Sequence, residues 1–278
     1  RDLVRSRGLG DVYKRQRDAF VHMHASNFKN FLFAGEAEAL AQMRGEYEII
    51  PNKTALLVGN YLHSYFESPE AHQQFKDEHP EIISTRGASK GQLKTEYKLA
   101  QAMIDRIEAD DSIMALINEA PDKESVIEGS IDGVEWRGKL DAVNFEEGYF
   151  VDFKTVKSLK EYHGLIGGEW SEHYGDYENF FIGRGYHMQM AAYQEMLCQM
   201  TGKNFEVYIV AVSKEDEPMA DVYQISQDTL DAGLAEIKAH QPRIVQLING
   251  EVEPDNANTY SRLYRTNYRV DPEHVVTL

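Results

Sequence analysis

The sequence predicts an α/β protein in which a three-stranded antiparallel meander lies between helical segments. Asp-Gly at 132–133 separates two strand-like segments, residues 126–131 and 134–145, and this dipeptide is a strong signal for a tight hairpin. A second turn at 146–147 returns the chain through the apolar run 149–155. Helical patterns stand on both sides of this meander, and the buried strand FEVYIVAV follows it. We therefore expect a central mixed sheet flanked by helices.

The remaining elements follow from capping residues and periodicity. Ser26 or Asn27 is expected to cap a helix over 28–43, and Asn52 a helix that runs to about Glu67. Further helices are expected at about 92–108, 112–118, 179–200 and 226–249, with ADVYQIS as an edge-like strand. The segment at about 163–178, rich in Gly, His, Tyr and acidic residues, is either a mobile element near a functional site or a simple connection.

The second hairpin places charged residues on one face of the sheet. Opposed residues have numbers that sum to 293 if the turn is centred on 146–147, so Asp141 lies across from Asp152. Lys154 comes two residues later and shares their face. Opposed like charges are destabilising and Asp is depleted in strands, so a divalent cation is a natural compensation. Ordinary exposed carboxylates are the alternative, and a three-residue loop would move Asp141 to the other face.

These residues carry a family resemblance. The pattern D-x10-D-x-K, from Asp141 to Lys154, resembles the PD-(D/E)XK nuclease superfamily. Upstream, the segment GNYLHSYFE at 59–67 is similar to the helix that supplies a metal-binding histidine in the RecE/RecB-like branch. Downstream, HMQMAAY at 187–193 is similar to its helical Q-x3-Y motif. The four motifs occur in the family order over roughly residues 19–250, and they most resemble phage-type RecE-like exodeoxyribonucleases.

The resemblance implies a set of site residues. Asp141 and Asp152 would hold a Mg²⁺ ion, and Mn²⁺ would also support activity, with the Phe153 carbonyl and His63 completing the metal shell. Lys154 would orient and help to deprotonate the attacking water, which makes it catalytic together with the two aspartates. Gln189 and Tyr193, one helical turn apart, would contact the substrate phosphate or brace the lysine. Without the resemblance, a lone helical histidine such as His63 is more often structural.

Glu128 is expected opposite Arg137 in the first hairpin. A plain cross-strand ion pair and a second-shell or metal role for Glu128 are equally compatible with that position.

The same resemblance implies a Mg²⁺-dependent deoxyribonuclease. Its expected activity is that of a 5′→3′ exonuclease on double-stranded DNA ends in phage-type recombination, with a single-strand annealing protein as partner and a homo-oligomeric assembly. An endonuclease or nickase with the same site is one alternative. A non-catalytic DNA-binding or assembly subunit on the same fold is the other.

The charge of the chain opposes a nucleic-acid function. The formal net charge is −17, whereas DNA binding depends on cations that neutralise phosphates. Local basic patches reduce this conflict: Lys90, Lys94 and Lys98 would form one stripe on a helix and contact substrate, or would be a solvated face. Near the C-terminus, YSRLYRTNYR interleaves tyrosine with arginine, which suits base stacking or packing on a neighbouring subunit.

Composition limits the cellular setting. The single cysteine, Cys198, excludes a disulfide framework and a four-cysteine iron–sulfur cluster. No apolar stretch approaches the ~20 residues of a membrane helix, so a cytoplasmic protein in a bacterial or phage-infected cell without a membrane partner is expected. Residues 1–16 resemble translated adapter sequence, with a basic DNA-binding arm as the alternative, and residues 17–278 are expected to form a single domain.

Overall fold

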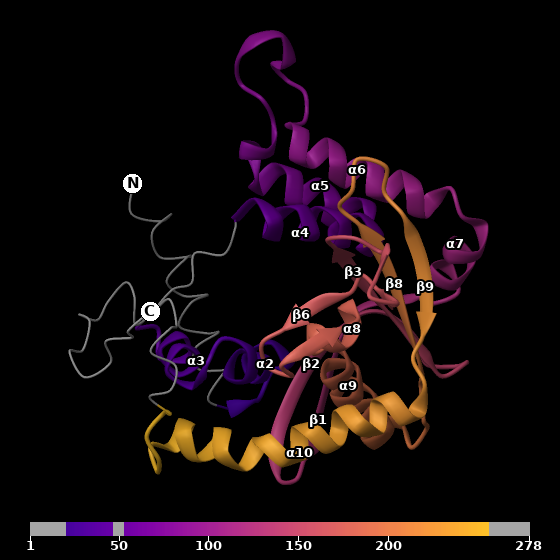
Figure 1. The fold of residues 1–278 in the computed structure, drawn as a ribbon. Coiled ribbons are helices and arrows are strands. Elements are labelled where there is room, and N and C mark those ends of the chain that lie inside the picture. The colour runs from indigo at the N-terminus through magenta and orange to yellow at the C-terminus, as the bar shows by residue number, and fades with distance from the viewer. Residues whose placement is uncertain (1–20, 47–52, 256–278) are drawn as a thin grey trace, which may run out of the picture.

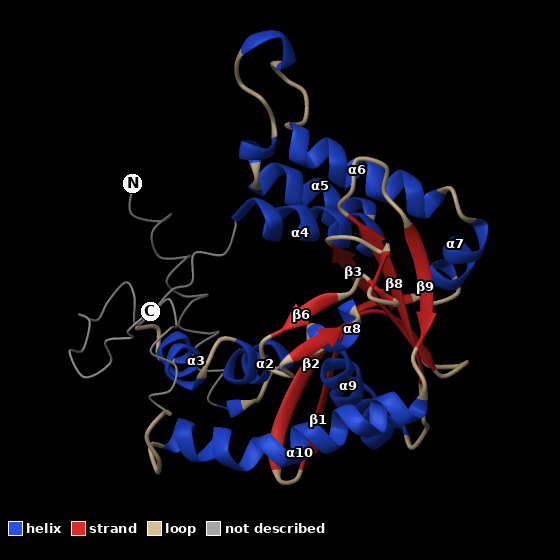
Figure 2. Ribbon diagram, viewed as in Figure 1, coloured by secondary structure: helices blue, strands red, loops and turns tan. Residues whose placement is uncertain are grey.

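The computed structural model describes residues 21–46 and 53–255, and a five-stranded mixed sheet organises them (Figures 1 and 2). The strand order is β1-β2-β3-β8-β9. Strands β1 to β3 form an antiparallel meander, β8 lies parallel to β3, and β9 is antiparallel to β8 at the edge. Their bounds are β1 Asp122–Ile131, β2 Val134–Asn144, β3 Tyr149–Val156, β8 Glu206–Ser213 and β9 Ala220–Gln224. The predicted α/β class and the meander are confirmed.

The two hairpins have the predicted registers where their strands pair, but the expected pair Asp141–Asp152 is absent, because the β2–β3 ladder ends at Ala142 and Val151. Ile131 pairs with Val134 around Asp132-Gly133, and both turn residues have positive φ, as a type I′ turn requires. In the second hairpin Asn144 pairs with Tyr149, so opposed numbers sum to 293 as expected. Its turn is longer than a two-residue connection. The Asn144 side-chain oxygen accepts hydrogen bonds from the backbone N–H groups of Glu146 and Glu147, which closes the turn.

Helices cover both faces of the sheet (Figure 1). One face packs against α4 to α7, and we call the apolar contacts there the α4-side core. The other face packs against α2, α3, α9 and α10, and we call those contacts the α9-side core. The bounds on the first side are α4 Lys53–Glu67, α5 Pro69–Glu78, α6 Thr95–Glu108 and α7 Asp111–Asn118. Those on the second are α2 Ala25–Phe33, α3 Glu36–Met43, α9 Tyr186–Thr201 and α10 Gln227–Asn249.

Two of the predicted helices are each divided in two. The helix expected over 28–43 breaks at Gly35, whose φ is 102°, and the cap position before α2 is His24 rather than Ser26 or Asn27. The helix expected over 179–200 breaks at Gly185, with φ 64°, into α8 (Phe180–Gly183) and α9. Positive φ is accessible to glycine at little cost and interrupts a right-handed helix. The last helix, capped by the Ser226 side chain, is as expected.

The segment expected as a loop at about 163–178 contains two short hairpins. They are β4–β5 and β6–β7, inserted between β3 and α8. Their bounds are β4 Glu161–Tyr162, β5 Leu165–Ile166, β6 Glu169–Ser171 and β7 Asp176–Glu178. Short 3-10 turns at Pro80–Ile82 and Gly87–Ser89 lie in the connection between α5 and α6.

Several expectations fall outside the described residues. These are the cap at Asn52, the tail at 1–16 and the Tyr/Arg segment at 260–269. Within the described part of the chain, no helix combines the length and the hydropathy that a membrane crossing requires.

Candidate active site

Asp141 stands where β2 and β3 separate. Regular pairing of these strands stops at Ala142 and Val151, so Asp141, the residue before Ala142, has no partner in the ladder. Instead its carboxylate accepts a hydrogen bond of 2.7 Å from the backbone N–H of Phe153. The other carboxylate oxygen lies 3.0 Å from Nδ1 of His63, which α4 brings over the end of the meander. The predicted association of His63 with Asp141 is therefore present.

Asp152 and Lys154 form the second half of the site. They alternate with Phe153 along β3, so they face the α9 side while Phe153 stacks on Phe66 in the α4-side core. The Lys154 ammonium forms an ion pair with Oδ2 of Asp152, and both side chains are almost completely buried. This oxygen has no aligned hydrogen-bond donor among the described residues besides that ion pair. A buried carboxylate with so few donors is suited to holding a cation.

The pKa values report how closely these groups interact. Burial opposes ionisation of Asp141, but His63, Lys154 and the Phe153 N–H outweigh it and hold the pKa of Asp141 below its ordinary value. Burial raises the pKa of Asp152 despite Lys154, and the Asp141 charge adds to that rise. Burial alone would lower the pKa of Lys154, yet Asp152, Tyr186 and Asp141 raise it. Lys154 is thus the protonated partner of this carboxylate pair.

Glu124 is a third carboxylate at this point, and the sequence patterns do not reveal it. Its oxygen, one from Asp141 and a ring nitrogen of His63 all lie within 4.8 Å of one another. Glu124 lies in β1 between the paired residues Lys123 and Ser125, at the position that would pair with Asp141 if the β1–β2 ladder were regular. Glu124 has φ 52°, which is uncommon for a residue with a side chain. This local irregularity brings Glu124 toward His63, and Lys139 forms an ion pair with it.

The donor set fits a hard divalent cation. One imidazole and several carboxylates are ligands that Mg²⁺ or Mn²⁺ accepts. Neighbouring ligands in an octahedral shell of about 2.1 Å radius lie about 3 Å apart. The 3.0 Å between His63 Nδ1 and Asp141 Oδ1 has this size. Asp152 is not among the residues His63, Glu124 and Asp141 whose ligand atoms all lie within 4.8 Å of one another, so its place in the same metal shell stays a prediction.

Helix α9 supplies the opposite wall of the site. Lys154 Nζ lies 4.7 Å from the ring centre of Tyr186, and Gln189 donates to the Tyr193 hydroxyl at 3.1 Å. Gly138 on β2 leaves room for the Tyr193 ring, because an added Cβ would come within 2.5 Å of it. Burial and the Asp152 charge raise the pKa of Tyr193 to about 12, so its hydroxyl keeps its proton. Gln189 and Tyr193 therefore lie on the side of the sheet that Asp152 and Lys154 face, which is compatible with the position that the Q-x3-Y resemblance implies.

Lys29 is a second residue that sequence reasoning missed. It extends from α2 to within 4.6 Å of the Tyr186 ring centre and lies 3.5 Å from the Gln189 side-chain oxygen. Burial, with Lys154 nearby, lowers the pKa of Lys29 to about 7. The signal was a cation within the aromatic helix SNFKNFLF, where an unpaired charge is costly.

Two sets of predicted residues lie elsewhere. Glu128 forms an exposed cross-strand ion pair with Arg137 at 3.3 Å, which is the simpler of its two predicted roles. The helical stripe of lysines is wrong, because α6 begins only at Thr95. Lys90 follows the 3-10 turn Gly87–Ser89 and lies outside α6, so helical spacing does not relate it to Lys98. Lys94 is the N-cap of α6, and its carbonyl accepts a hydrogen bond of 3.0 Å from the Lys98 N–H. Gly91, with φ 83°, turns the chain between Lys90 and Lys94.

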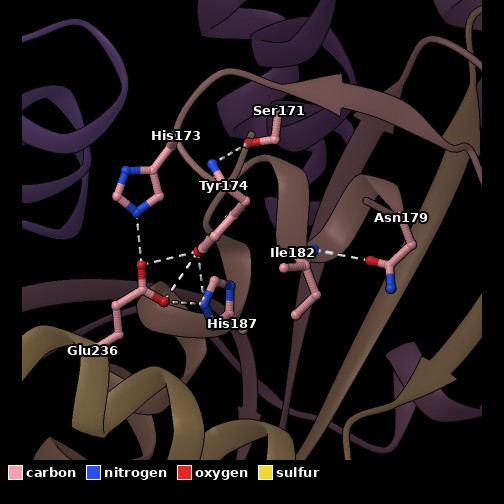
Figure 3. Close-up of polar contacts among 7 residues, drawn as sticks. All are labelled: Ser171, His173, Tyr174, Asn179, Ile182, His187 and Glu236. Atoms are coloured by element: carbon pink, nitrogen blue, oxygen red, sulfur yellow. Dashed lines mark hydrogen bonds and ion pairs between the residues drawn. The ribbon is translucent and has the colours of Figure 1, made fainter. Parts of the chain in front are cut away.

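A second polar cluster lies between the inserted hairpins, α9 and α10 (Figure 3). The Glu236 carboxylate accepts hydrogen bonds from the Tyr174 hydroxyl at 3.0 Å and lies 2.9 Å from ring nitrogens of both His173 and His187. His173 and Tyr174 belong to the β6–β7 turn, whose Ser171 hydroxyl also accepts from the Tyr174 N–H. The cluster thereby fastens this turn to the two helices.

Comparison with known proteins places the fold. Residues 24–263 match the family model described as a PDDEXK-like domain of unknown function (DUF3799). Among solved structures, the chain is similar to a protein of Eubacterium rectale whose crystal structure is described as that of a putative exonuclease. The two are 31% identical with a TM-score of 0.78, and the match covers 93% of this chain and 92% of the other. No curated protein matches the chain. The chain belongs to the PDDEXK-like family and has the fold of the PD-(D/E)XK nuclease superfamily.

Proposed function

We propose that this member of the PDDEXK-like family is a metal-dependent deoxyribonuclease that degrades linear duplex DNA from its ends, most simply as a 5′→3′ exonuclease. The proposal is supported chiefly by three contacts around Phe153. His63 contacts Asp141, Asp141 accepts a hydrogen bond from the Phe153 N–H, and the neighbours of Phe153 in β3, Asp152 and Lys154, form a buried ion pair. The end of the meander brings a nitrogen ligand, acidic ligands and a lysine together. The order of the RecE-like motifs, and the description of the Eubacterium rectale protein as a putative exonuclease, favour exonucleolytic cleavage.

The chemistry requires compensation of negative charge. Hydrolysis of a phosphodiester increases the charge on the phosphoryl oxygens and on the leaving oxygen. A Mg²⁺ or Mn²⁺ ion bound by Asp141, Asp152 and His63 would supply the electrostatic stabilisation and an acidified water. Glu124 is placed to act as an additional acidic ligand, or to orient a water in that shell.

The protein side chains complete the reaction. A divalent cation bound to Asp152 would weaken the attraction of that carboxylate for the Lys154 proton, and the pKa of Lys154 would then be lower. Lys154 then orients the attacking water and exchanges a proton with it. Tyr186, Gln189 and Tyr193 form the wall against which the scissile phosphate is positioned. Lys29 adds a cationic or neutral hydrogen-bond donor on that wall.

Local charge reduces the objection raised by the acidic composition without removing it. The chain has a formal net charge of −17, yet Lys29, Lys154 and Arg184 gather beside Tyr186, where Lys154 is paired with Asp152 and Arg184 with Glu169. DNA phosphates that enter the site meet this local field rather than the average charge of the surface. Contacts of Lys90, Lys94 and Lys98 with DNA stay a prediction, as do a homo-oligomeric assembly and a single-strand annealing partner.

One assay tests the proposal directly. Purified protein is mixed with linear duplex labelled at either 5′ or 3′ end, or with covalently closed circular duplex, in Mg²⁺, Mn²⁺ or EDTA. We expect metal-dependent release of nucleotides from the 5′-terminated strand of the linear duplex and survival of the circles. Asp141→Asn, which keeps the shape of the side chain, is the inactive control.

The alternatives give different results in the same assay. Cutting of closed circles as fast as linear DNA would establish an endonuclease. Absence of cleavage in both metals, with binding retained, would establish a non-catalytic DNA-binding subunit and overturn the proposal.

A further inference from the structure

The two inserted hairpins expose a group of aromatic rings. Tyr162 and His163 come from the tip of β4–β5, and Trp170 and Tyr177 are cross-strand partners in β6–β7. We call these four residues the aromatic platform. Trp170 is 49% exposed and Tyr162 52% exposed, although large aromatic side chains are usually much more buried.

The platform is continuous. The His163 ring lies 4.4 Å from those of both Tyr162 and Tyr177, and Tyr177 lies 5.5 Å from Trp170. Such distances are those of interacting aromatic pairs. The rings therefore form one surface rather than four isolated exposed residues.

A pocket joins the platform to the active site. It has a volume of about 510 Å³, within the range of small-ligand sites, and Tyr162 lines it on the platform side. Tyr186, whose ring contacts the Lys154 ammonium, lines it on the catalytic side together with Thr155, the residue after Lys154. We call it the basic pocket.

The charges of the basic pocket favour an anion. Its lining includes four cations, Lys157, Lys160, Arg184 and Lys214, and two carboxylates, Glu161 and Glu169. Arg184 is paired with Glu169, and Lys160 with Glu215 at 2.7 Å, so part of this charge is already compensated. With Glu215 counted, four cations face three carboxylates, so the pocket keeps an excess of one positive charge, whereas the whole chain has a formal net charge of −17. Phosphate groups are attracted to this excess.

The hairpins are held in position by close packing. A Cβ at Gly168 would lie 2.4 Å from the Tyr162 carbonyl oxygen. Only glycine therefore allows the segment between β5 and β6 to pass this close to β4. At the other end, the Glu236 cluster holds the β6–β7 turn against α9 and α10 (Figure 3). The platform is consequently preorganised, which lowers the entropic cost of binding.

We propose that the basic pocket and the aromatic platform form a binding track for unpaired DNA, in which phosphates occupy the pocket and bases stack on Trp170, Tyr177 and Tyr162. The inference rests on the proposed deoxyribonuclease function and names the form of DNA that the site handles. Aromatic surfaces beside cationic grooves bind single strands because every base has a stackable face, whereas bases within a duplex are already stacked. The track accordingly favours separation of the duplex end next to the catalytic strand.

The two tryptophans of the chain provide a direct readout. Trp136 is 1% exposed and donates its indole N–H to Gln241, whereas Trp170 lies on the platform. Bases that stack on Trp170 should quench its emission and leave that of Trp136. We would titrate the full-length protein in EDTA with an oligothymidylate of about twelve nucleotides, with an abasic chain of equal length and charge, and with a blunt duplex.

We expect saturable quenching by oligothymidylate, little quenching by the abasic chain and weaker quenching by the duplex. Trp170→Ala combined with Tyr177→Ala should weaken oligothymidylate binding, measured by anisotropy, by roughly five- to a hundredfold. Met219→Ala, which removes an exposed apolar side chain outside the platform, should bind like the wild type. Circular dichroism establishes that each variant is folded.

The outcomes separate this inference from the proposed function. Metal-dependent cleavage of linear DNA, with no quenching and with wild-type affinity of the double variant, would overturn the track and leave the nuclease intact. Absence of both cleavage and binding would overturn both. Trp170 emission that changes with protein concentration and not with DNA would show that the platform is an interface between copies of this chain, and would also overturn the track.

Discussion

The two faces of the sheet make different contributions to the candidate site. The α4 side is almost wholly apolar where it meets β3, and His63 is the group that it extends to the site. The α9 side contributes Lys29, Tyr186, Gln189 and Tyr193, and it also contains the partly buried Glu236 cluster. One face thus supports a metal ligand through packing, whereas the other builds the polar wall that faces the substrate.

Strand β3 accounts for this division. Its side chains alternate, so Phe153 enters the α4-side core while Asp152 and Lys154 point the other way. Asp141 reaches both sides because the β2–β3 ladder ends beside it. The difference teaches that the faces should respond differently to substitution, and four experiments examine this.

The largest expected effect belongs to Lys154. Lys154→Met should reduce the cleavage rate by ~10²–10⁴ because it removes the group that orients and exchanges a proton with water. Lys154→Arg should not restore activity, since guanidinium keeps its proton and presents its donors differently. Single-turnover cleavage of end-labelled duplex at saturating Mg²⁺ measures both. Lys238→Met is the control and should retain activity. Lys238 lies on α10, where it pairs with Asp132 of the β1–β2 turn. Near-normal rates for Lys154→Arg would reduce Lys154 to an electrostatic clamp.

The next effect concerns the single ligand from the α4 side. His63→Ala should weaken Mn²⁺ binding by roughly 10–100-fold, as loss of a group in or next to a metal shell commonly does. Isothermal titration calorimetry of the metal-free protein gives the affinity. Glu128→Ala, which breaks an exposed ion pair on the same meander, should leave the affinity unchanged. Equal affinities for His63→Ala and the wild type would make His63 a structural residue.

Two glycines contrast the packing of the faces. A Cβ at Gly233 would lie 2.7 Å from the His187 carbonyl oxygen, so Gly233→Ala should force α10 from α9 and cost ~1–3 kcal/mol. At Gly59 in α4 the nearest atom is Thr155 Oγ1 at 3.8 Å, an ordinary contact. Gly59→Ala should therefore stabilise the protein by ~0.5–1 kcal/mol through helix propensity. Urea unfolding measures both, and effects of the same sign would contradict the contrast.

The pH dependence of stability tests the Glu236 cluster. Burial opposes ionisation of Glu236, but hydrogen bonds from His173, His187 and Tyr174 outweigh it and lower the pKa of the carboxyl. A lowered pKa means that the carboxylate contributes its stability above the ordinary value of 4.5 and loses it as the pH falls toward the folded-state value.

Glu236→Gln should accordingly cost about 1–3 kcal/mol at pH 7 and progressively less below pH 4.5. Urea unfolding of both proteins between pH 7 and pH 3 measures the difference. A stability difference that does not change over this range would show that the charge of Glu236 has no part in holding the β6–β7 turn.

The sequence by itself determined where the strand residues of this candidate site lie. Hairpin register depends on local turns and on strand alternation, so Asp141, Asp152 and Lys154 could be placed at the end of one meander from residue numbers alone. The expected association of His63 with Asp141 depended on motif resemblance, whereas that of Gln189 with Tyr193 followed from helical spacing, and both contacts are present in the structure.

Tertiary structure alone decided the rest. Glu124 reaches the metal-binding group through a backbone irregularity with positive φ, and no local pattern specifies such a feature for glutamate. Lys29 enters the site because α2 packs beside α9, a contact between residues 160 positions apart. The predicted stripe of lysines was wrong because helical spacing applies only within a helix. The chain turns at Gly91 and α6 begins at Thr95, and local sequence did not reveal either boundary. Local register is encoded over a few residues, whereas the approach of distant helices depends on the free energy of the whole core.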